Sequence, residues 1–117
     1  MKKILIIEDY ILEIYLMEEV LKNKYEIKAL TDASNTVELI KKYQPDLVIL
    51  DIIMPNKSGL EIIKEIGTMT KVIVVSSISE KYIKNRVLNL GAKFYLEKPI
   101  NLSFFKEIID EELAYIS

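Results

Sequence analysis

The sequence contains neither cysteine nor histidine. Without cysteine there is no disulfide framework and no thiolate metal site, which suits a reducing compartment. Without histidine the chain cannot build a Ser-His-Asp triad, use a histidine general base or bind a metal through imidazole. These two absences exclude several common classes of catalytic and metal site.

Glycine and arginine are scarce as well. The three glycines form no glycine-rich phosphate loop, so nucleotide binding is not favoured. Of the 16 basic residues only Arg86 is an arginine, the residue that best recognises phosphates and bases. Acidic and basic residues are interspersed and the formal net charge is −2, so we expect no direct binding of nucleic acid.

Long hydrophobic segments are also absent. The first apolar run, residues 4–7, is far too short for a signal peptide or a membrane span, and it ends at Glu8 and Asp9. We therefore expect a cytoplasmic protein with no membrane segment. A length of 117 residues predicts a single domain, and 50% hydrophobic residues provide ample material for a core.

The chain is organised around residues 46–55. Four consecutive branched apolar residues, 47–50, end at Asp51. An uninterrupted run of this kind predicts a strand buried on both faces, at the centre of a parallel sheet. Asp51 is then the first polar group beyond the carboxyl end of that strand, where open α/β sheets bind ligands. Pro55 prevents the strand from continuing.

Strand and helix patterns alternate five times. Strands are predicted at residues 2–7, 25–30, 47–50, 72–75 and 94–96, and helices at residues 10–22, 36–43, 59–66, 80–90 and 102–115. The first helix is predicted from the spacing of Ile11, Leu12, Tyr15, Leu16, Val20 and Leu21. The expected helix caps are Asp9, Ser34 or Asn35, Ser58, Ser79 and Asn101, with Gly67 and Gly91 at the ends of the third and fourth helices. The alternation predicts a flavodoxin-like (βα)5 fold of the α/β class, with a parallel sheet of order 2-1-3-4-5 and helices on both faces.

Polar side chains follow four of the predicted strands: Glu8 and Asp9, then Asp51, Ser76 and Lys98. The carboxyl ends of parallel strands share one edge of the sheet, so these groups should converge. Three converging carboxylates repel one another without a cation, and an all-oxygen cluster is typical of a Mg²⁺ site. A lysine and a hydroxyl nearby suit the oxygens of a phosphoryl group. Each residue alone has a structural explanation, as a cap, a turn residue or a surface lysine, but all four strand ends together favour a site.

These residues belong to a wider pattern. Its pieces are residues 6–9, residues 45–55 with residues 58–61, residues 74–77, and residues 91–93 through Lys98 and Pro99. With these pieces the sequence resembles, over nearly its whole length, the receiver domain of two-component response regulators, of the stand-alone chemotaxis or phosphorelay type. The resemblance predicts a single receiver domain over residues 1–117 with no output domain in this chain. Whether such a chain stands alone or is part of a longer regulator is left open.

The resemblance implies a phosphorylation site. Asp51 would be the phospho-acceptor, and the phosphoryl group would come from a partner histidine kinase or histidine phosphotransfer protein. Glu8, Asp9 and Asp51 would hold Mg²⁺ together with the backbone carbonyl of Ile53. The chain would be a signalling switch that catalyses only its own phosphorylation and slow dephosphorylation.

The resemblance also implies a switch. Ser76 would be the switch hydroxyl, Lys98 would bind the phosphoryl group, and Tyr95 would be the aromatic side chain that changes rotamer. The peptide between Lys98 and Pro99 would be cis. The surface formed by residues 80–90, 94–96 and 102–115 would then change shape to signal an unknown effector or to form a homodimer.

Three positions depart from the commonest pattern of the family, and two more are apolar where family members vary. Glu8 replaces aspartate and Ser76 replaces threonine, and both keep the chemistry, while Thr36 stands where glycine is frequent. Ile53 and Ile78 stand two residues after Asp51 and Ser76, where side chains in the family can position the attacking water. Because isoleucine cannot hydrogen-bond water, we predict slow self-dephosphorylation.

The last helix has a second apolar stripe. Phe105 and Ile109 continue an inward stripe from Leu102, whereas Phe104, Ile108 and Tyr115 lie on a neighbouring one. Two alternatives follow for Phe104. It is either exposed and contacts a partner or a second copy, or it packs under the fourth helix.

Two rival functions remain. A haloacid dehalogenase-type hydrolase also places an aspartate after a parallel strand and uses magnesium, but it requires a second aspartate two residues later, where this chain has Ile53. A degenerate receiver would bind partners without phosphorylation. The presence of all five polar residues at the strand ends argues against that reading.

Overall fold

The computed structural model describes residues 1–54 and 57–114. Strands and helices alternate along the described chain. The strands are β1 (Lys3–Ile7), β2 (Glu26–Leu30), β3 (Leu47–Asp51), β4 (Lys71–Ser76) and β5 (Phe94–Glu97). The helices are α1 (Ile11–Leu21), α2 (Thr36–Tyr43), α3 (Gly59–Ile66), α4 (Lys81–Asn89) and α5 (Leu102–Ala114). Pro55 and Tyr115 lie outside the described residues.

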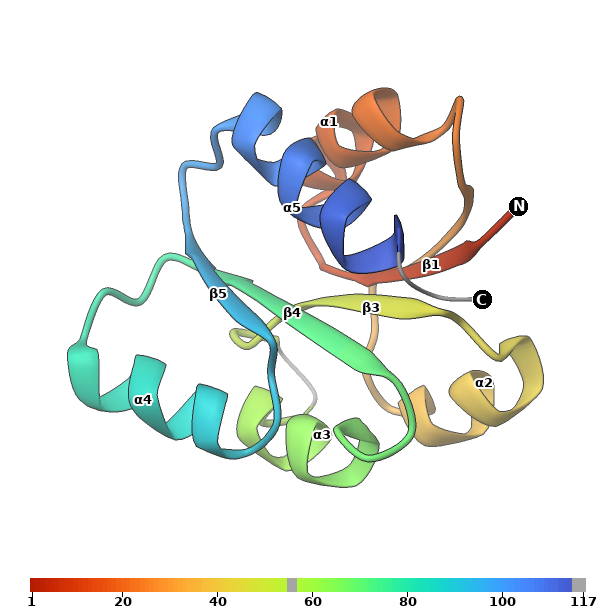
Figure 1. Cartoon of the computed structure of the whole chain (residues 1–117). Helices are drawn as coiled ribbons and strands as arrows, with labels where there is room; N and C mark the ends of the chain where they lie inside the picture. The colour runs from red at the N-terminus through yellow and green to blue at the C-terminus, as the bar shows by residue number, and fades with distance from the viewer. Residues whose placement is uncertain (55–56, 115–117) are drawn as a thin grey trace.

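The strands form one parallel sheet in the order β2-β1-β3-β4-β5. Helices α1 and α5 cover one face of this sheet, and α2, α3 and α4 cover the other (Figure 1). The central strand β3 is buried along its whole length, which is the reason for its uninterrupted apolar sequence. The predicted fold and strand order are therefore confirmed.

Side chains alternate between two cores, because successive residues of a strand point to opposite faces. Under α1 and α5, the buried strand residues are Ile4, Ile6, Leu47, Ile49, Ile73 and Val75. Under α2, α3 and α4, they are Leu5, Ile7, Val48, Leu50, Val72 and Val74. Branched apolar residues at successive positions of the inner strands thus supply both cores.

Helix α1 does not bury the face that the spacing suggested. Its buried residues are Ile14, Met17 and Leu21. The side chains that point outward are Ile11, Leu12, Tyr15 and Leu16, with Tyr10 directly before them, and we call these five residues the α1 surface. The helix is apolar nearly all round, so periodicity identified the helix without identifying its inner face.

Two predicted helix caps are wrong. Helix α1 begins one residue later than expected, with Tyr10 rather than Asp9 at the N-cap, and α4 has Glu80 rather than Ser79 there. Asn101 does cap α5, since its Oδ1 accepts a hydrogen bond from the backbone N–H of Phe104 at 3.0 Å. For the other two helices, Asn35 and Ser58 occupy the N-cap positions without a side-chain hydrogen bond to the helix.

Two glycines fix the positions of neighbouring loops. A Cβ at Gly59 would overlap the backbone of Ile52, so glycine lets α3 begin against the segment that leaves β3. Gly91 follows α4 with a φ of 120°, as expected for a glycine that closes a helix. The loop after Asp51 is therefore held close to the helix that follows it.

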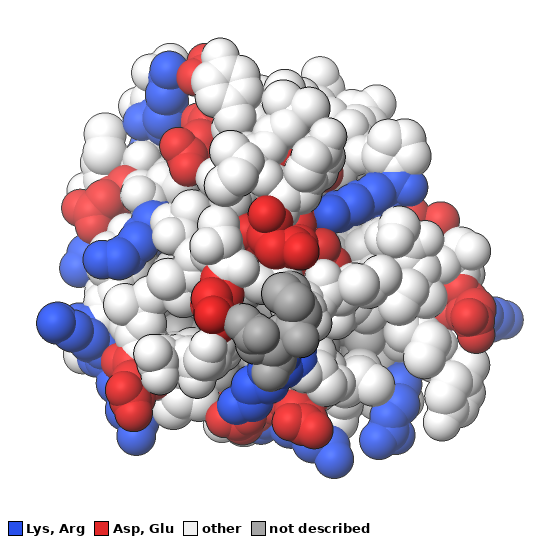
Figure 2. Space-filling view, turned by 180° about the vertical axis from the view of Figure 1, so that it is seen from behind, with Lys and Arg blue, Asp and Glu red and all other residues white. Residues whose placement is uncertain are grey.

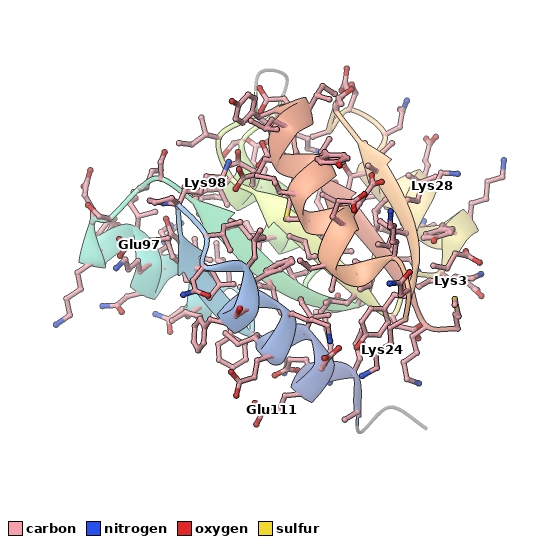
Figure 3. The ribbon with its side chains drawn as sticks, turned by 90° about the horizontal axis from the view of Figure 1, so that it is seen from above. Lys3, Lys24, Lys28, Glu97, Lys98 and Glu111 are labelled. Carbon is pink, nitrogen blue, oxygen red and sulfur yellow. The ribbon has the colours of Figure 1, made fainter. Side chains whose placement is uncertain are left out.

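Two of the lysines labelled in Figure 3 mark opposite ends of the strands. Lys98 follows the end of β5, whereas Lys3 begins β1. In residues 1–54 and 57–114, no helix combines the length and apolarity that a membrane crossing requires.

Candidate functional site

The carboxyl ends of β1, β3, β4 and β5 carry the predicted polar residues. Asp51 and Ser76 end β3 and β4, while Glu8 directly follows β1 and Lys98 directly follows β5. Since all strands are parallel, these ends share one edge of the sheet. One carboxylate oxygen each from Glu8, Asp9 and Asp51 lie within 4.8 Å of one another. The expected convergence of the acids at the junction of β1 and β3 is confirmed.

Lys98 reaches this acidic cluster from the end of β5, an edge strand of the sheet. Its Nζ lies 2.7 Å from Oε1 of Glu8 and 3.1 Å from Oδ2 of Asp51. The ammonium group therefore bridges two acids that belong to neighbouring strands. Figure 3 shows the Lys98 side chain directed toward the beginning of α1, while Glu97 points toward α4, where it pairs with Lys84.

Asp51 is held at both carboxylate oxygens. Its Oδ1 accepts a hydrogen bond from the backbone N–H of Ile53 at 2.9 Å, and its Oδ2 accepts one from Lys98. Only 6% of the residue is exposed. The carboxylate is thus oriented by its own loop and by the lysine, but retains a small accessible surface.

Glu8 is buried, and burial disfavours the charged form of its carboxylate. Burial raises the pKa of Glu8 to about 7; the hydrogen bond from Lys98 opposes this rise, and the nearby charge of Asp51 adds to it. Its Oε2 accepts a hydrogen bond from the backbone N–H of Tyr10 at 3.2 Å. Glu8 thus bonds to the backbone directly before α1, while no side chain caps that helix.

The cluster has more negative groups than positive ones. Burial lowers the pKa of Lys98, but hydrogen bonds from its ammonium to Glu8 and Asp51 outweigh this effect and raise the pKa above its usual value. One charged ammonium thus faces three carboxylates. The donor set consists entirely of oxygen atoms and carries excess negative charge, which is the chemistry of a site for a hard divalent cation. Figure 2 shows acidic side chains gathered near the middle of one molecular face, among mostly uncharged ones.

Ser76 and Tyr95 both bond to the backbone of Ile78, a link that the sequence did not predict. Ser76 is fully buried, and its Oγ accepts a hydrogen bond from the backbone N–H of Ile78 at 3.1 Å. The hydroxyl of Tyr95 donates to the backbone carbonyl of the same Ile78 at 2.7 Å. Both bonds involve backbone atoms, so the side chain of Ile78 gave no signal of this link.

The segment around Lys98 has the expected conformation. The peptide between Lys98 and Pro99 is cis. The backbone N–H of Lys98 donates to the carbonyl of Ser76 at 2.9 Å, which fixes the start of its side chain beside the end of β4. Together with the two acids, this bond determines where the ammonium lies.

The remaining predicted residues lie on the surface around the site or away from it. Ile53 is half exposed, next to Asp51. Phe104 is 53% exposed, as the first of its two alternatives expects, and its contact with a partner or a second copy stays a prediction. Ile108 on the same predicted stripe is buried. Phe104 lines a pocket together with Tyr95 of β5 and Pro99 of the segment that follows β5.

Comparison with known proteins agrees with this geometry. The family described as the response regulator receiver domain matches residues 4–110. The chain is 31% identical to the chemotaxis protein CheY of Halobacterium salinarum, over 97% of this chain and 98% of that protein. It also matches longer regulators, of which it spans between 36% and 52%.

Solved structures of receiver proteins superpose closely. A CheY-like receiver domain protein from Methanospirillum hungatei has a TM-score of 0.90 at 26% identity, covering 97% of this chain and 94% of that one. The Mn²⁺-bound form of the response regulator Rcp1 has a TM-score of 0.80 at 25% identity, covering 98% and 94%. The family match covers nearly the whole chain and includes the acidic cluster. The chain therefore belongs to the response regulator receiver domain family.

Proposed function

We propose that this chain is phosphorylated on Asp51 by a partner histidine kinase or histidine phosphotransfer protein. As a receiver domain, the chain is a signalling switch of two-component signal transduction rather than a conventional enzyme. The observation that carries the proposal is the position of Asp51, whose Oδ2 lies 3.1 Å from Nζ of Lys98 beside two further acids. The chain has no histidine, so the phosphohistidine must belong to the partner.

Mg²⁺ fits the acidic cluster. Glu8, Asp9 and Asp51 supply oxygen ligands, and the Ile53 carbonyl would complete the protein's share, leaving room for water and phosphoryl oxygens. The Mn²⁺-bound structure of Rcp1 supports a divalent cation in a protein of this fold. When bound, the cation would supply positive charge that neutralises the transferred group.

The phosphoryl transfer needs little beyond positioning. A carboxylate oxygen of Asp51 attacks the phosphorus in line, the new O–P bond forms as the P–N bond breaks, and the electron pair leaves with the imidazole of the donor. Lys98 donates hydrogen bonds to phosphoryl oxygens as charge develops there. The backbone N–H of Ile53 holds the other oxygen of Asp51 at 2.9 Å and so keeps the nucleophile oriented.

The signal then passes through Ile78. We propose that the acyl phosphate draws the hydroxyl of Ser76 toward it through a charge-assisted hydrogen bond, which breaks the bond between Ser76 and the N–H of Ile78. The carbonyl of Ile78 anchors Tyr95, so the rotamer of Tyr95 responds to the same change. The two bonds link Ser76 to Tyr95 through the backbone of Ile78.

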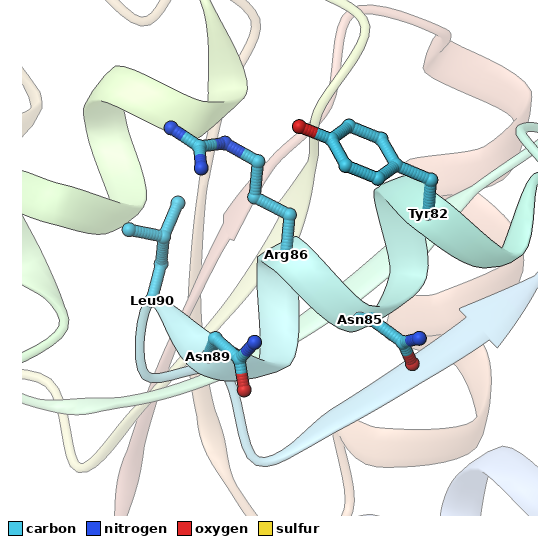
Figure 4. A pocket seen from close by; sticks show the side chains of 5 residues that line it. All are labelled: Tyr82, Asn85, Arg86, Asn89 and Leu90. Atoms are coloured by element: carbon cyan, nitrogen blue, oxygen red, sulfur yellow. The ribbon is translucent and has the colours of Figure 1, made fainter.

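The surface that receives this signal comprises α4, β5 and α5. Its exposed large apolar side chains are Tyr82, Leu88, Phe94 and Phe104. A pocket of about 320 Å³ on α4 is lined by Tyr82, Asn85, Arg86, Asn89 and Leu90, with Tyr82 and Arg86 on the same side of the helix (Figure 4). We propose that this surface binds a second copy of the chain once Asp51 is phosphorylated. An effector protein is the alternative occupant.

The first prediction concerns Asp51. Incubation with acetyl phosphate and Mg²⁺ should give base-labile, acid-stable phosphorylation of the wild-type chain, and Asp51→Asn should abolish it, because an amide is not a nucleophile here. Intact-protein mass spectrometry measures the added phosphoryl group. Phosphorylation retained by Asp51→Asn would contradict the proposal.

The second prediction concerns the lifetime of the phosphorylated state. Ile53 is half exposed next to Asp51 and cannot orient water, so Ile53→Asn should shorten the phosphorylated state several-fold. The decay of the acyl phosphate after removal of acetyl phosphate measures this lifetime. Ile11→Asn is the matched control, since Ile11 is an exposed isoleucine on the α1 surface. A lifetime unchanged in Ile53→Asn, or equally shortened in the control, would refute the role given to Ile53.

The third prediction concerns the α4–β5–α5 surface. Beryllofluoride with Mg²⁺, a mimic of the phosphoryl group, should promote self-association of the wild-type chain, and Phe104→Glu should abolish it by placing a charge in the apolar contact. Sedimentation velocity measures the oligomeric state. Tyr15→Glu is the control, because Tyr15 is similarly exposed, 56% against 53%, but lies on the α1 surface. Self-association that survives in Phe104→Glu would exclude this surface as the dimer contact.

A further inference from the structure

A buried tyrosine ties α5 to the start of β2. Tyr25 directly precedes β2 and is only 5% exposed. Its hydroxyl donates a hydrogen bond to Oδ1 of Asp110 on α5, with 2.5 Å between the two oxygen atoms. A buried tyrosine hydroxyl usually has such a partner, because leaving it unbonded away from water is costly. The bond therefore holds the second half of α5 beside the start of this strand.

The carboxylate of Asp110 has two further partners. Nζ of Lys106 lies 2.6 Å from its Oδ2, and Nζ of Lys24 lies 3.4 Å from its Oδ1. Burial raises the pKa of Asp110, but the hydrogen bonds from its three partners outweigh this effect and lower the pKa below its usual value. Asp110 therefore stays charged, and a charged acceptor makes the hydrogen bond from Tyr25 stronger than a neutral one would.

A second polar contact holds the same half of α5. Lys71, the first residue of β4, donates from Nζ to the backbone carbonyl of Glu112 at 2.9 Å and to its Oε2 at 3.2 Å. Ile108, Ile109 and Leu113 are buried in the core between α5 and the sheet. Polar contacts and apolar packing thus fix the second half of the helix together. We call the polar contacts of residues 110 and 112 the α5 anchor.

The start of α5 lies between two pockets. One pocket, of about 330 Å³, is lined by Phe104 and by residues of β5. The other, of about 110 Å³, lies toward α1 and is lined by Leu102 and Leu16 among others. The segment that leads into α5 takes part in both, since Pro99 and Ile100 line each pocket. Side chains here have free space beside them, and loosely packed segments move at lower cost than close-packed ones.

We propose that the α5 anchor keeps residues 108–114 in place while phosphorylation of Asp51 moves residues 99–104. Nζ of Lys98 lies 3.1 Å from Asp51 and this lysine directly precedes the moving segment, so a change at the carboxylate reaches that segment first. Phe104 is then the part of α5 that changes position for a partner. This inference rests on the proposed function, because the signal that moves the segment comes from Asp51.

The first measurement tests the α5 anchor without phosphorylation. Hydrogen exchange, followed residue by residue by NMR, should be slower in wild type for the amides of residues 109–113 than for those of residues 105–108. Tyr25→Phe removes the hydroxyl but keeps the ring that packs in the core. It should speed exchange of residues 109–113 about tenfold, the equivalent of about 1.4 kcal/mol, while the amides of β3 change less.

Tyr43→Phe is the matched control. The hydroxyl of Tyr43 also donates to an acceptor distant in the sequence, the backbone carbonyl of Glu26, at 3.5 Å. Tyr43 ends α2, which lies on the opposite face of the sheet from α5 (Figure 1). The same loss of a hydroxyl at this position should therefore leave the exchange of residues 109–113 unchanged.

The second measurement adds beryllofluoride and Mg²⁺, at a protein concentration where sedimentation velocity shows a monomer. The amide shift of Asp51 reports binding of the mimic. In wild type, backbone chemical shifts along α5 should change at residues 101–104 and stay nearly constant at residues 109–113. In Tyr25→Phe the changes should extend into residues 109–113, because the released half of the helix moves with its start.

The outcomes separate this inference from the proposed function. Wild-type shift changes as large at residues 109–113 as at residues 101–104 would overturn the inference and leave phosphorylation of Asp51 intact. Exchange of residues 109–113 that Tyr25→Phe leaves unchanged, or that Tyr43→Phe speeds equally, would overturn it in the same way. If beryllofluoride changes no shift, at Asp51 or elsewhere, the inference and the proposed function both fail.

Discussion

The site depends on acidic side chains that the fold holds together at the carboxyl ends of its parallel strands. Glu8 and Asp51 end up almost completely buried beside one another because β1 and β3 are adjacent and parallel, and Asp9 adds a third acid. Their repulsion is offset by the ammonium of Lys98, which reaches them from the end of β5. The site therefore holds an excess of negative charge that a divalent cation can offset.

The rigidity of the sheet makes this arrangement useful. Two apolar cores clamp the inner strands, so their carboxyl ends cannot move apart to relieve the repulsion. Ile78 lies in the loop after β4, with its N–H bonded to Ser76 and its carbonyl bonded to Tyr95. Ser76 and Tyr95 are thus joined through one backbone residue, and Tyr95 packs against the core under α2, α3 and α4.

The strand order and the convergence of the site residues could be predicted because both follow from patterns that are local in the sequence. The apolar run before Asp51 and the alternation of strands with helices were sufficient. The inner face of α1 could not be predicted, since a helix that is apolar on all sides gives no direction to its periodicity. The ion pair between Glu8 and Lys98 and the shared backbone of Ile78 were missed because they depend on side-chain reach and main-chain atoms, which a residue pattern does not contain.

The most direct test of the account is a crystal structure of the protein with Mg²⁺ and beryllofluoride. We expect beryllium bonded to a carboxylate oxygen of Asp51, a fluorine within hydrogen-bond distance of Nζ of Lys98, and Mg²⁺ bound by Glu8, Asp9 and Asp51. A structure in which beryllofluoride does not occupy Asp51, and in which Lys98 still bridges Glu8 and Asp51 with Mg²⁺ bound elsewhere, would contradict it.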